Sequence, residues 1–414
     1  MNPLASLAPA IKDIASAQKT SFATTQATWR FLNNERVSFK QLNQPIESLA
    51  INELKRSNHA FALVAHNWSQ LQYVKHNHKE NRFERTHAHD LSYELQSSLL
   101  INAEDGMPIA PIAQTLTDAK GCYSTFSEHY NSKEKHLDSL MEQIEHIESQ
   151  MLGKKLVHII DHQGDSVAHL RFMQQQDYLY LIRGKEGHLV EYQGKNYKVR
   201  EVSDQMVLSS AQKVNYKGRT EQLYVGEAEI KITRNAKPKK IDTNGKRIPP
   251  QKGIPLDVRL IIAEVRDIDG KTLARWTLLS NVPSEIKMFE LAQWYYWRWN
   301  IESFFKLLKQ AGYDVESWLQ TTPQAILRRL LISCMACVLT WRIQRNNDEQ
   351  NTKVRVFLTR ISGRQQKRGR RESAPAILAG LSILLNTLQL LSEYSIDDLK
   401  SMAEIALGYP YNDV

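Results

Sequence analysis

The sequence contains only three cysteines, Cys122, Cys334 and Cys337, among its 414 residues. Three cysteines cannot form a disulfide framework, and one C-x-x-C without a second pair is a poor zinc motif. Cys334 and Cys337 share a strongly apolar segment that we expect to be helical. We therefore expect plain core cysteines in a reducing cytosol.

Long hydrophobic runs are also missing. The apolar run at residues 330–341, LLISCMACVLTW, is shorter than the ~20 residues that a membrane-spanning helix needs. Residues 1–16 lack a cationic lead followed by an apolar core, so we expect no secretory signal and no membrane partner. A composition of 42% apolar and 24% charged residues is typical of a soluble globular chain with roughly two to four domains.

Acidic residues are fewer than basic ones, which leaves a formal charge of +9. The cationic residues occur in clusters. Residues 233–253 contain seven Lys and Arg residues and one Asp, and residues 360–371 contain six Lys and Arg residues and no acidic residue. Such runs are either solvated loops or loops that bind phosphates, where each neutralised phosphate adds affinity and salt sensitivity. Both alternatives stay open, although the net charge favours a polyanionic partner.

The first half of the chain predicts a mixed α/β sheet. Short helices are expected within residues 1–55, followed by strands at 60–68, 71–76, 93–103 and 107–113. A helix with apolar residues at helical spacing is expected at 132–152. A buried strand at 155–161, a short helix and a strand at 178–184 complete this part.

The second half changes character twice. Residues 186–283 alternate strands and turns, so we expect an all-β insertion. Ser284 is a candidate N-cap, after which helices are expected at 295–309, 324–344, 374–392 and 396–407, with a basic loop after the second. The expected divisions are 1–55, a helical DNA-binding region; 56–185, the first part of a catalytic core; 186–284, the insertion; 285–345, the second part of the core; and 346–414, a helical region for dimerisation.

The stretch YYWRWNIESFFKLLK at 295–309 carries the most chemistry. Its polar residues that share one side of a helix, within roughly 60° of one another, are Tyr295, Arg298, Glu302 and Lys309. A plain i,i+4 ion pair of Arg298 with Glu302 on a surface helix would explain the charges. It would not explain Trp299 and Phe305, which flank the polar side. A carboxylate beside cations suits a site that holds a metal ion and a phosphodiester together.

One carboxylate cannot hold two Mg²⁺, so further oxygen ligands are expected at strand ends. Asp161 ends the strand at 155–161, where a mixed sheet presents side chains at one edge. The central strand at 60–68 offers Asn67 instead of an acid.

The spacing Tyr295-x2-Arg298-x3-Glu302-x6-Lys309 resembles the Y-x2-R-x3-E-x6-K signature of insertion-sequence-4 family DDE transposases, bacterial cut-and-paste enzymes that free their element through a DNA hairpin. Segments elsewhere are similar to other motifs of that family and together cover most of the chain, least after residue 345. They are DHQGD (161–165, second aspartate), VAHNWSQLQY (64–73, first aspartate), RWTLLSNVP (275–283, the strand before the signature) and RFLNN (30–34, N-terminal DNA-binding helices).

The resemblance implies an RNase H-like domain interrupted by the β-rich insertion. Two Asp and one Glu would bind two Mg²⁺, for which Mn²⁺ can substitute, and the ions would drive in-line displacement. It implies a cytoplasmic, nucleoid-associated protein that binds double-stranded transposon ends and target DNA as a homodimer. The residues it assigns as catalytic metal ligands are Asn67, Asp161 and Glu302; those it assigns to DNA are Tyr295, Arg298, Lys309, Lys306, Trp276, Arg183 and Arg30, with Trp276 either stacked on a flipped base or part of the core.

Asn67 departs from the family pattern, which has Asp there. An amide offers one neutral oxygen and cannot match a carboxylate for Mg²⁺. An engineered change and natural decay both fit, and the otherwise intact motifs favour the first. We expect a chain that binds transposon ends and barely cuts them.

Other functional hypotheses are open. A non-catalytic, domesticated transposase would be a DNA-binding protein, and Asn67 favours it. A nuclease or resolvase for branched DNA would share the metal site without end-specific binding. A zinc or iron site is a further hypothesis, but no Cys or fixed carboxylate completes it. The histidines that suggest it are His66, His76, His78, His87 and His89.

Overall fold

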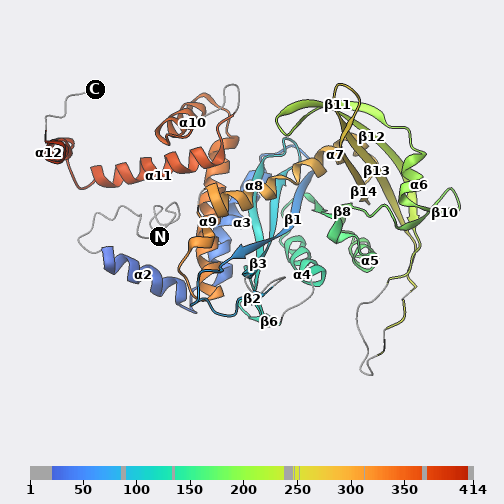
Figure 1. Ribbon diagram of the computed structural model, residues 1–414, viewed down its shortest axis with the longest axis horizontal. Helices are drawn as coiled ribbons and strands as arrows, with labels where there is room; N and C mark the ends of the chain where they lie inside the picture. The colour runs from blue at the N-terminus through green and yellow to red at the C-terminus, as the bar shows by residue number, and fades with distance from the viewer. Residues whose placement is uncertain are drawn as a thin grey trace.

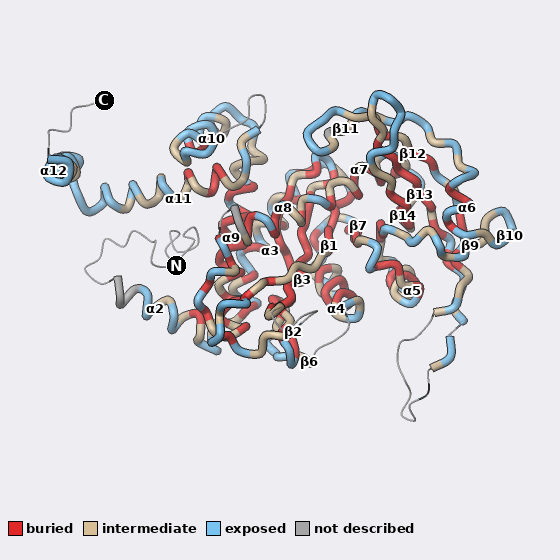
Figure 2. The backbone as a smooth tube through the Cα atoms, viewed as in Figure 1, coloured by how far each residue is buried: buried red, intermediate tan, exposed pale blue. Residues whose placement is uncertain are grey.

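The computed structural model describes residues 21–84, 90–132, 136–236, 246, 248–250, 252–311, 313–365 and 371–408. Figure 1 shows a broad twisted sheet with helices on both faces, and two C-terminal helices that project from the body. Buried residues are concentrated in the sheet and in the helices next to it (Figure 2).

Five strands form the middle of the sheet. They are β1 (Phe61–Gln72), β3 (Leu91–Asn102), β4 (Pro108–Thr117), β7 (Lys155–Ile160) and β8 (Leu179–Arg183). Strands β1, β3 and β4 are antiparallel neighbours, whereas β7 is parallel to β1 and β8 is parallel to β7. The order across the sheet is β4-β3-β1-β7-β8. The prediction of a mixed α/β sheet is confirmed. Short strands extend its edge or flank it: β2 (Phe83–Glu84), β5 (Gly121–Ser124) and β6 (Asn131–Ser132).

The sequence of β1 explains its central place. Its first six residues, FALVAH, are all buried, because strands covered on both faces read as nearly continuous apolar runs. The two strands expected at 60–68 and 71–76 are one strand of 12 residues that ends at Gln72, and the prediction is wrong for residues 73–76, which form a turn. β7 repeats the pattern, with every residue after Lys155 buried.

Helices cover both faces of this sheet. Side chains of successive strand residues point to opposite faces, and Gln114 contacts Cys334 of α9 (Pro323–Arg345) while Thr115 contacts Gln143 of α4 (His136–Ser149). On the α9 face lie also α3 (Phe39–Leu54) and α8 (Asn300–Lys306). All three cysteines are free and buried, as expected for core residues.

The β-rich insertion continues the same sheet. Its strands are β9 (Leu189–Tyr192), β10 (Lys195–Lys198), β11 (Ser209–Tyr216), β12 (Arg219–Ile232), β13 (Leu256–Arg266) and β14 (Thr272–Ser280). β14 pairs with β8 and so joins the insertion to the middle of the sheet. The expectation of an all-β insertion is wrong in one detail, because α6 (Val199–Asp204) lies within it.

The helical regions also differ from expectation in places. α7 (Met288–Trp297) begins after Lys287, so Ser284 is not its N-cap. α10 (Glu349–Ile361) occupies part of the region expected to be a loop. The helices expected at 374–392 and 396–407 are confirmed as α11 (Ala374–Leu391) and α12 (Ile396–Leu407), and α2 (Ser21–Asn33) and α5 (Val167–Gln175) are the remaining α-helices among the described residues.

α11 is unusually apolar for a helix that projects from the body. By length and composition alone it is the one described helix that could cross a membrane, and 22% of it is buried inside the protein. Its buried residues, Ala376, Ile377, Leu378 and Gly380, all lie in its first half. This helix is therefore a core element of its own chain in that half only.

Gly380→Ala is expected to destabilise the protein by about 1–3 kcal/mol, because a Cβ at Gly380 would overlap the backbone of Leu358 on α10. Chemical denaturation would measure the loss. Ser382→Ala on the same helix is the control, since it adds no atoms and should change stability little. A Gly380→Ala chain as stable as the original would contradict this account of how α10 and α11 pack.

Candidate functional site

The pairing of β1 with β7 positions two of the predicted site residues. Ala65 of β1 lies opposite Ile159 of β7 in a parallel register. Asn67 and Asp161 each follow two residues later, and Asp161 keeps an extended backbone with φ −76° and ψ −170°. Residues two apart in a strand share a face, and neighbouring strands are about 5 Å apart. Asn67, within β1, and Asp161, directly after β7, therefore emerge side by side from one face, just beyond the last paired residues of the two strands.

Glu302 reaches the same place from α8. The Asn67 amide Nδ2 donates a hydrogen bond of 2.5 Å to Glu302 Oε1, across 235 positions of sequence. Asn67 Oδ1 accepts from the backbone N–H of Trp68. Asp161 accepts from the backbone N–H of Gln163 at the start of a short 3-10 helix, His162–Gly164. The fold thus joins Asn67 to Glu302, and the strand register places Asp161 next to Asn67.

The signature stretch is not one helix, as the sequence predicted. α7 ends at Trp297, α8 begins at Asn300, and a π-helical turn, Leu307–Ala311, follows. Backbone bonds of the i,i+3 type join the two α-helices, for example from Arg298 N–H to the Tyr295 carbonyl. The end of α7 and the start of α8 both contact the turn at Gly106. The Trp297 ring lies against this glycine, and Asn300 Nδ2 donates a hydrogen bond to its carbonyl.

Tyr295 and Arg298 are buried rather than displayed on a surface stripe, with exposed fractions of 2% and 7%. Burial raises the pKa of the Tyr295 phenol; the cations of Arg298 and Arg183 oppose this shift, and Asp161 adds to it. Arg183 and Asp161 therefore lie near the phenol although neither belongs to the signature. The Tyr295 phenol of the signature therefore interacts electrostatically with Asp161, which follows β7, and with Arg183 at the end of β8.

The Arg298 guanidinium has N–H donors that make no hydrogen bond to the described residues. Its Nη1 lies 3.9 Å from Glu302 Oε1, too far for a hydrogen bond. Its Nε and Nη1 have no hydrogen-bond partner among the described residues. A buried cation with unused donors is costly unless a partner arrives. A planar guanidinium is suited to bind a phosphate through two such donors.

Lys309 is held by protein groups that the sequence did not indicate. Its Nζ donates to the Gln70 carbonyl and lies 3.2 Å from Glu316 Oε1. Glu316 also accepts from the backbone N–H of Gln72, which fixes the carboxylate against β1. Lys309 would have to exchange Glu316 for a phosphate. The only sequence signal for this pair is an acid seven residues after the lysine.

The other predicted DNA contacts are dispersed. Trp276 is 6% exposed, and its ring packs against Tyr295 and Tyr296 with centroids 6.2 Å away, so it is a core residue in this structure. Stacking on a base would require these rings to move. Lys306 is exposed on α8. Arg30 is exposed on α2, a helix far from β14 in the fold (Figure 1).

The second acid of DHQGD anchors the first basic segment. Asp165 has a fully buried side chain that accepts from Arg234 at 2.7 Å and from the Lys185 backbone N–H. Arg171 of α5 donates to the carbonyls of Arg234 and Ile254, so one guanidinium holds both ends of the segment. Sequence reasoning missed this clamp. Much of both basic segments, 233–253 and 360–371, lies outside the described residues.

Asn67 makes the three positions a poor metal site as they stand. Asp161 and Glu302 supply hard oxygen ligands, but the Asn67 amide directs an N–H at a Glu302 oxygen that an ion would need. Within the described part of the chain, no group of three or more His, Cys, Asp and Glu side chains could hold a metal ion. The residues present do not fit two Mg²⁺, and Asp at position 67 would complete a three-carboxylate set.

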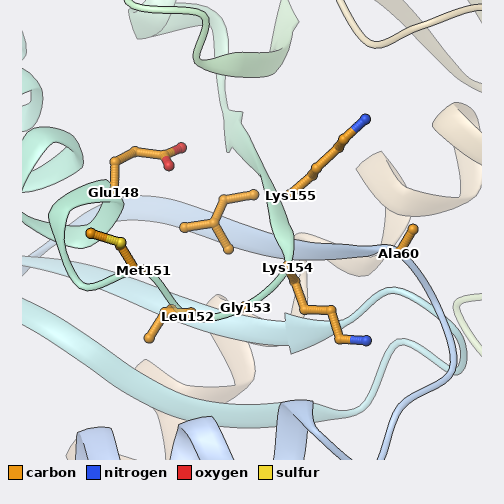
Figure 3. Close-up of a pocket in the computed structure, with 8 residues that line it drawn as sticks. Ala60, Glu148, Met151, Leu152, Gly153, Lys154 and Lys155 are labelled. Carbon is orange, nitrogen blue, oxygen red and sulfur yellow. The ribbon is translucent and has the colours of Figure 1, made fainter.

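Two further candidates do not join this site. Of the histidines considered for zinc or iron, His87 and His89 lie outside the described residues, and His66 is buried on the opposite face. A pocket of about 460 Å³ lies at the amino end of β7, lined by Glu148, Lys154 and Lys155 among others (Figure 3). None of the predicted site residues lines this pocket.

In a comparison with known protein families and with curated proteins, the chain matches none of them.

Asn67→Asp is expected to destabilise the chain in EDTA by about 1–2 kcal/mol, since a carboxylate would replace the donor that faces Glu302. Mg²⁺ or Mn²⁺ should recover the loss by binding the folded state. Thermal unfolding with and without ions would measure both effects. Asn43→Asp is the matched control, because the Asn43 amide donates to Glu47 at 2.7 Å, away from the site. Equal ion rescue of both variants would contradict the assignment.

Proposed function

We propose that the chain is a DNA transposase of the insertion-sequence-4 type, with an RNase H-like catalytic domain. The strand order β4-β3-β1-β7-β8, with three antiparallel and then two parallel strands, supports that domain assignment. The observation that carries the proposal is the hydrogen bond between Glu302 and Asn67, which the strand register places next to Asp161, although the three come from separate parts of the sequence. A chance match to the signature would not require Glu302 to contact Asn67 in the strand next to β7.

The site suits the handling of a phosphodiester. Arg298 presents unused N–H donors beside Glu302, and Tyr295 and Arg183 lie close to the same strand ends. A phosphate placed there would satisfy the guanidinium and would be held against the carboxylates. An ion bound by a three-carboxylate set would supply Lewis-acid activation of the reacting oxygens. In this chain Asn67 leaves that chemistry impaired, and end binding remains.

The proposed partners follow from this activity. Double-stranded DNA, as transposon ends and target, would occupy the site, and a second copy of the chain would hold the other end. Exposed apolar side chains on and after α11 support a dimer contact, and they include Ile383, Leu388, Leu390, Leu391, Tyr394 and Ile396. A protein with this role acts in the cytoplasm at the nucleoid.

The alternative function is that of a domesticated DNA-binding protein without catalysis. The Asn67–Glu302 hydrogen bond favours it, because this bond assembles the site without any ion. The two functions differ in what Asp at position 67 would restore. A branched-DNA nuclease stays a weaker candidate, since no described feature favours it.

The Asn67→Asp chain is expected to nick oligonucleotides taken from the ends of its element in the presence of Mg²⁺ or Mn²⁺, whereas the original chain binds them without cutting. Denaturing gels would resolve the products. The double variant Asn67→Asp, Glu302→Gln is the control and should be inert. Random and branched DNA as competitors separate a transposase from a resolvase. An inert Asn67→Asp chain that still binds ends would favour the domesticated protein.

Arg298→Leu is expected to weaken binding of end DNA roughly 5- to 10-fold at 0.1 M salt and to reduce the salt dependence of log K by about one ion. Fluorescence anisotropy across a salt series would measure both. Arg56→Leu is the control, because Arg56 is an exposed cation, paired with Glu53, that precedes the opposite end of β1. If both variants lose affinity equally, the unused donors of Arg298 have no specific role.

A further inference from the structure

The face of the sheet opposite Asn67 is polar where α4 covers β1. His66 precedes Asn67 and therefore points to this other face. Four side chains here are completely buried and polar, a rare arrangement for the layer between a helix and a central strand: His66, His158, Ser98 and Gln143. None of them takes part in the proposed chemistry.

These groups form one continuous chain of hydrogen bonds. Gln143 Nε2 donates to Ser98 Oγ at 2.5 Å, and Ser98 Oγ lies 2.8 Å from His66 Nδ1. His66 Nε2 lies 2.9 Å from His158 Nδ1. His158 Nε2 lies 2.9 Å from Glu148 Oε1. This chain of hydrogen bonds starts on α4 at Gln143, crosses β3, β1 and β7, and returns to α4 at Glu148.

The carboxylate at one end fixes the direction of the chain. Glu148 accepts, so a neutral His158 carries its proton on Nε2 and offers Nδ1 as an acceptor. His66 must then donate from Nε2, which leaves its Nδ1 to accept the Ser98 hydroxyl proton. Burial lowers the pKa of His66, and the neighbouring His158 lowers it further, which agrees with a neutral His66 ring. Every group in the chain is satisfied in this arrangement.

The position of the pair matters because the backbone pairing stops short of the site. The last paired residues of β1 and β7 are Ala65 and Ile159. Asn67 and Asp161 lie beyond this pair, where no ladder bond between the two strands sets their separation. The His66–His158 bond joins the same two strands by side chains, one residue before Asn67 and three before Asp161.

We propose that His66 and His158 are positioning residues that hold β1 and β7 at the separation which the site requires, just beyond the last backbone pair of the two strands. This inference rests on the proposed function, because it treats positions 67, 161 and 302 as one site. The outer end of the chain of hydrogen bonds reaches the protein surface, because the Glu148 side chain is 22% exposed and lines the pocket of Figure 3. The pair thus braces the site from the opposite face and touches no substrate.

The test uses full-length chains in the Asn67→Asp background, with Mn²⁺ as the probe. His66→Leu removes both hydrogen bonds of the ring, whereas His66→Gln keeps an N–H donor directed at His158. Thr115→Val is the matched control, since Thr115 bonds Gln143 at 3.0 Å in the same buried layer without joining β1 to β7. Titration calorimetry gives the Kd for Mn²⁺, and thermal unfolding gives Tm for each variant.

His66→Leu is expected to weaken Mn²⁺ binding at least tenfold, and His66→Gln to recover it to within about threefold of the parent. Thr115→Val should lower Tm and leave the Kd unchanged. A His66→Leu chain that loses Tm but keeps its Kd would overturn the positioning role and leave the proposed function intact. An Asn67→Asp parent that binds no Mn²⁺ would instead overturn the proposed metal site and this inference with it.

A second measurement stays decisive if His66→Leu does not fold. Histidine-labelled original chain should show, by nitrogen-detected NMR, a coupling across the hydrogen bond between Nε2 of one ring and Nδ1 of another. His66→Gln should abolish that coupling. Its absence from the folded original chain would overturn the proposal.

Discussion

The parallel pairing of β1 with β7 is the constraint on which the rest of the structure depends. Its register, with Ala65 opposite Ile159, places Asn67 beside Asp161, and α8 brings Glu302 to Asn67. A slip of one residue would turn one of these side chains to the α4 face, since side chains alternate along a strand. Parallel strands are covered on both faces, so the same pairing requires α4 on one side and α8 with α9 on the other.

Much of this arrangement could be predicted from the sequence. Apolar runs located β1, β3, β4, β7 and β8, and the motif spacing singled out Asp161 and Glu302. What failed depended on contacts between distant residues. Periodicity along 295–309 cannot show that Gly106 holds a joint at Trp297 and Asn300. The partner of Lys309 and the burial of Trp276 also depend on tertiary packing. The helix α10 was not predicted because its polar, cationic composition is typical of loops.

Asn67 changes the electrostatic balance of the site more than its shape. Three carboxylates so close together repel one another unless a cation lies between them. The amide removes one negative charge and donates to Glu302, so the fold holds the site together with no ion. Beneath it, a buried chain of side-chain hydrogen bonds runs from Gln143 to the partly exposed carboxylate of Glu148. Both faces of β1 at this point are therefore stabilised by directed hydrogen bonds instead of apolar packing.

The Arg171 clamp bears on how the chain can vary in length. Because one guanidinium holds the carbonyls of both Arg234 and Ile254, these two points of the chain are fixed relative to each other. Doubling the length of such an excursion costs only about 0.6 kcal/mol of loop-closure entropy. Insertions there would leave the register of β12 and β13 unchanged. The clamp thus makes this segment the place where evolution or an engineer can add a new module without disturbing the sheet.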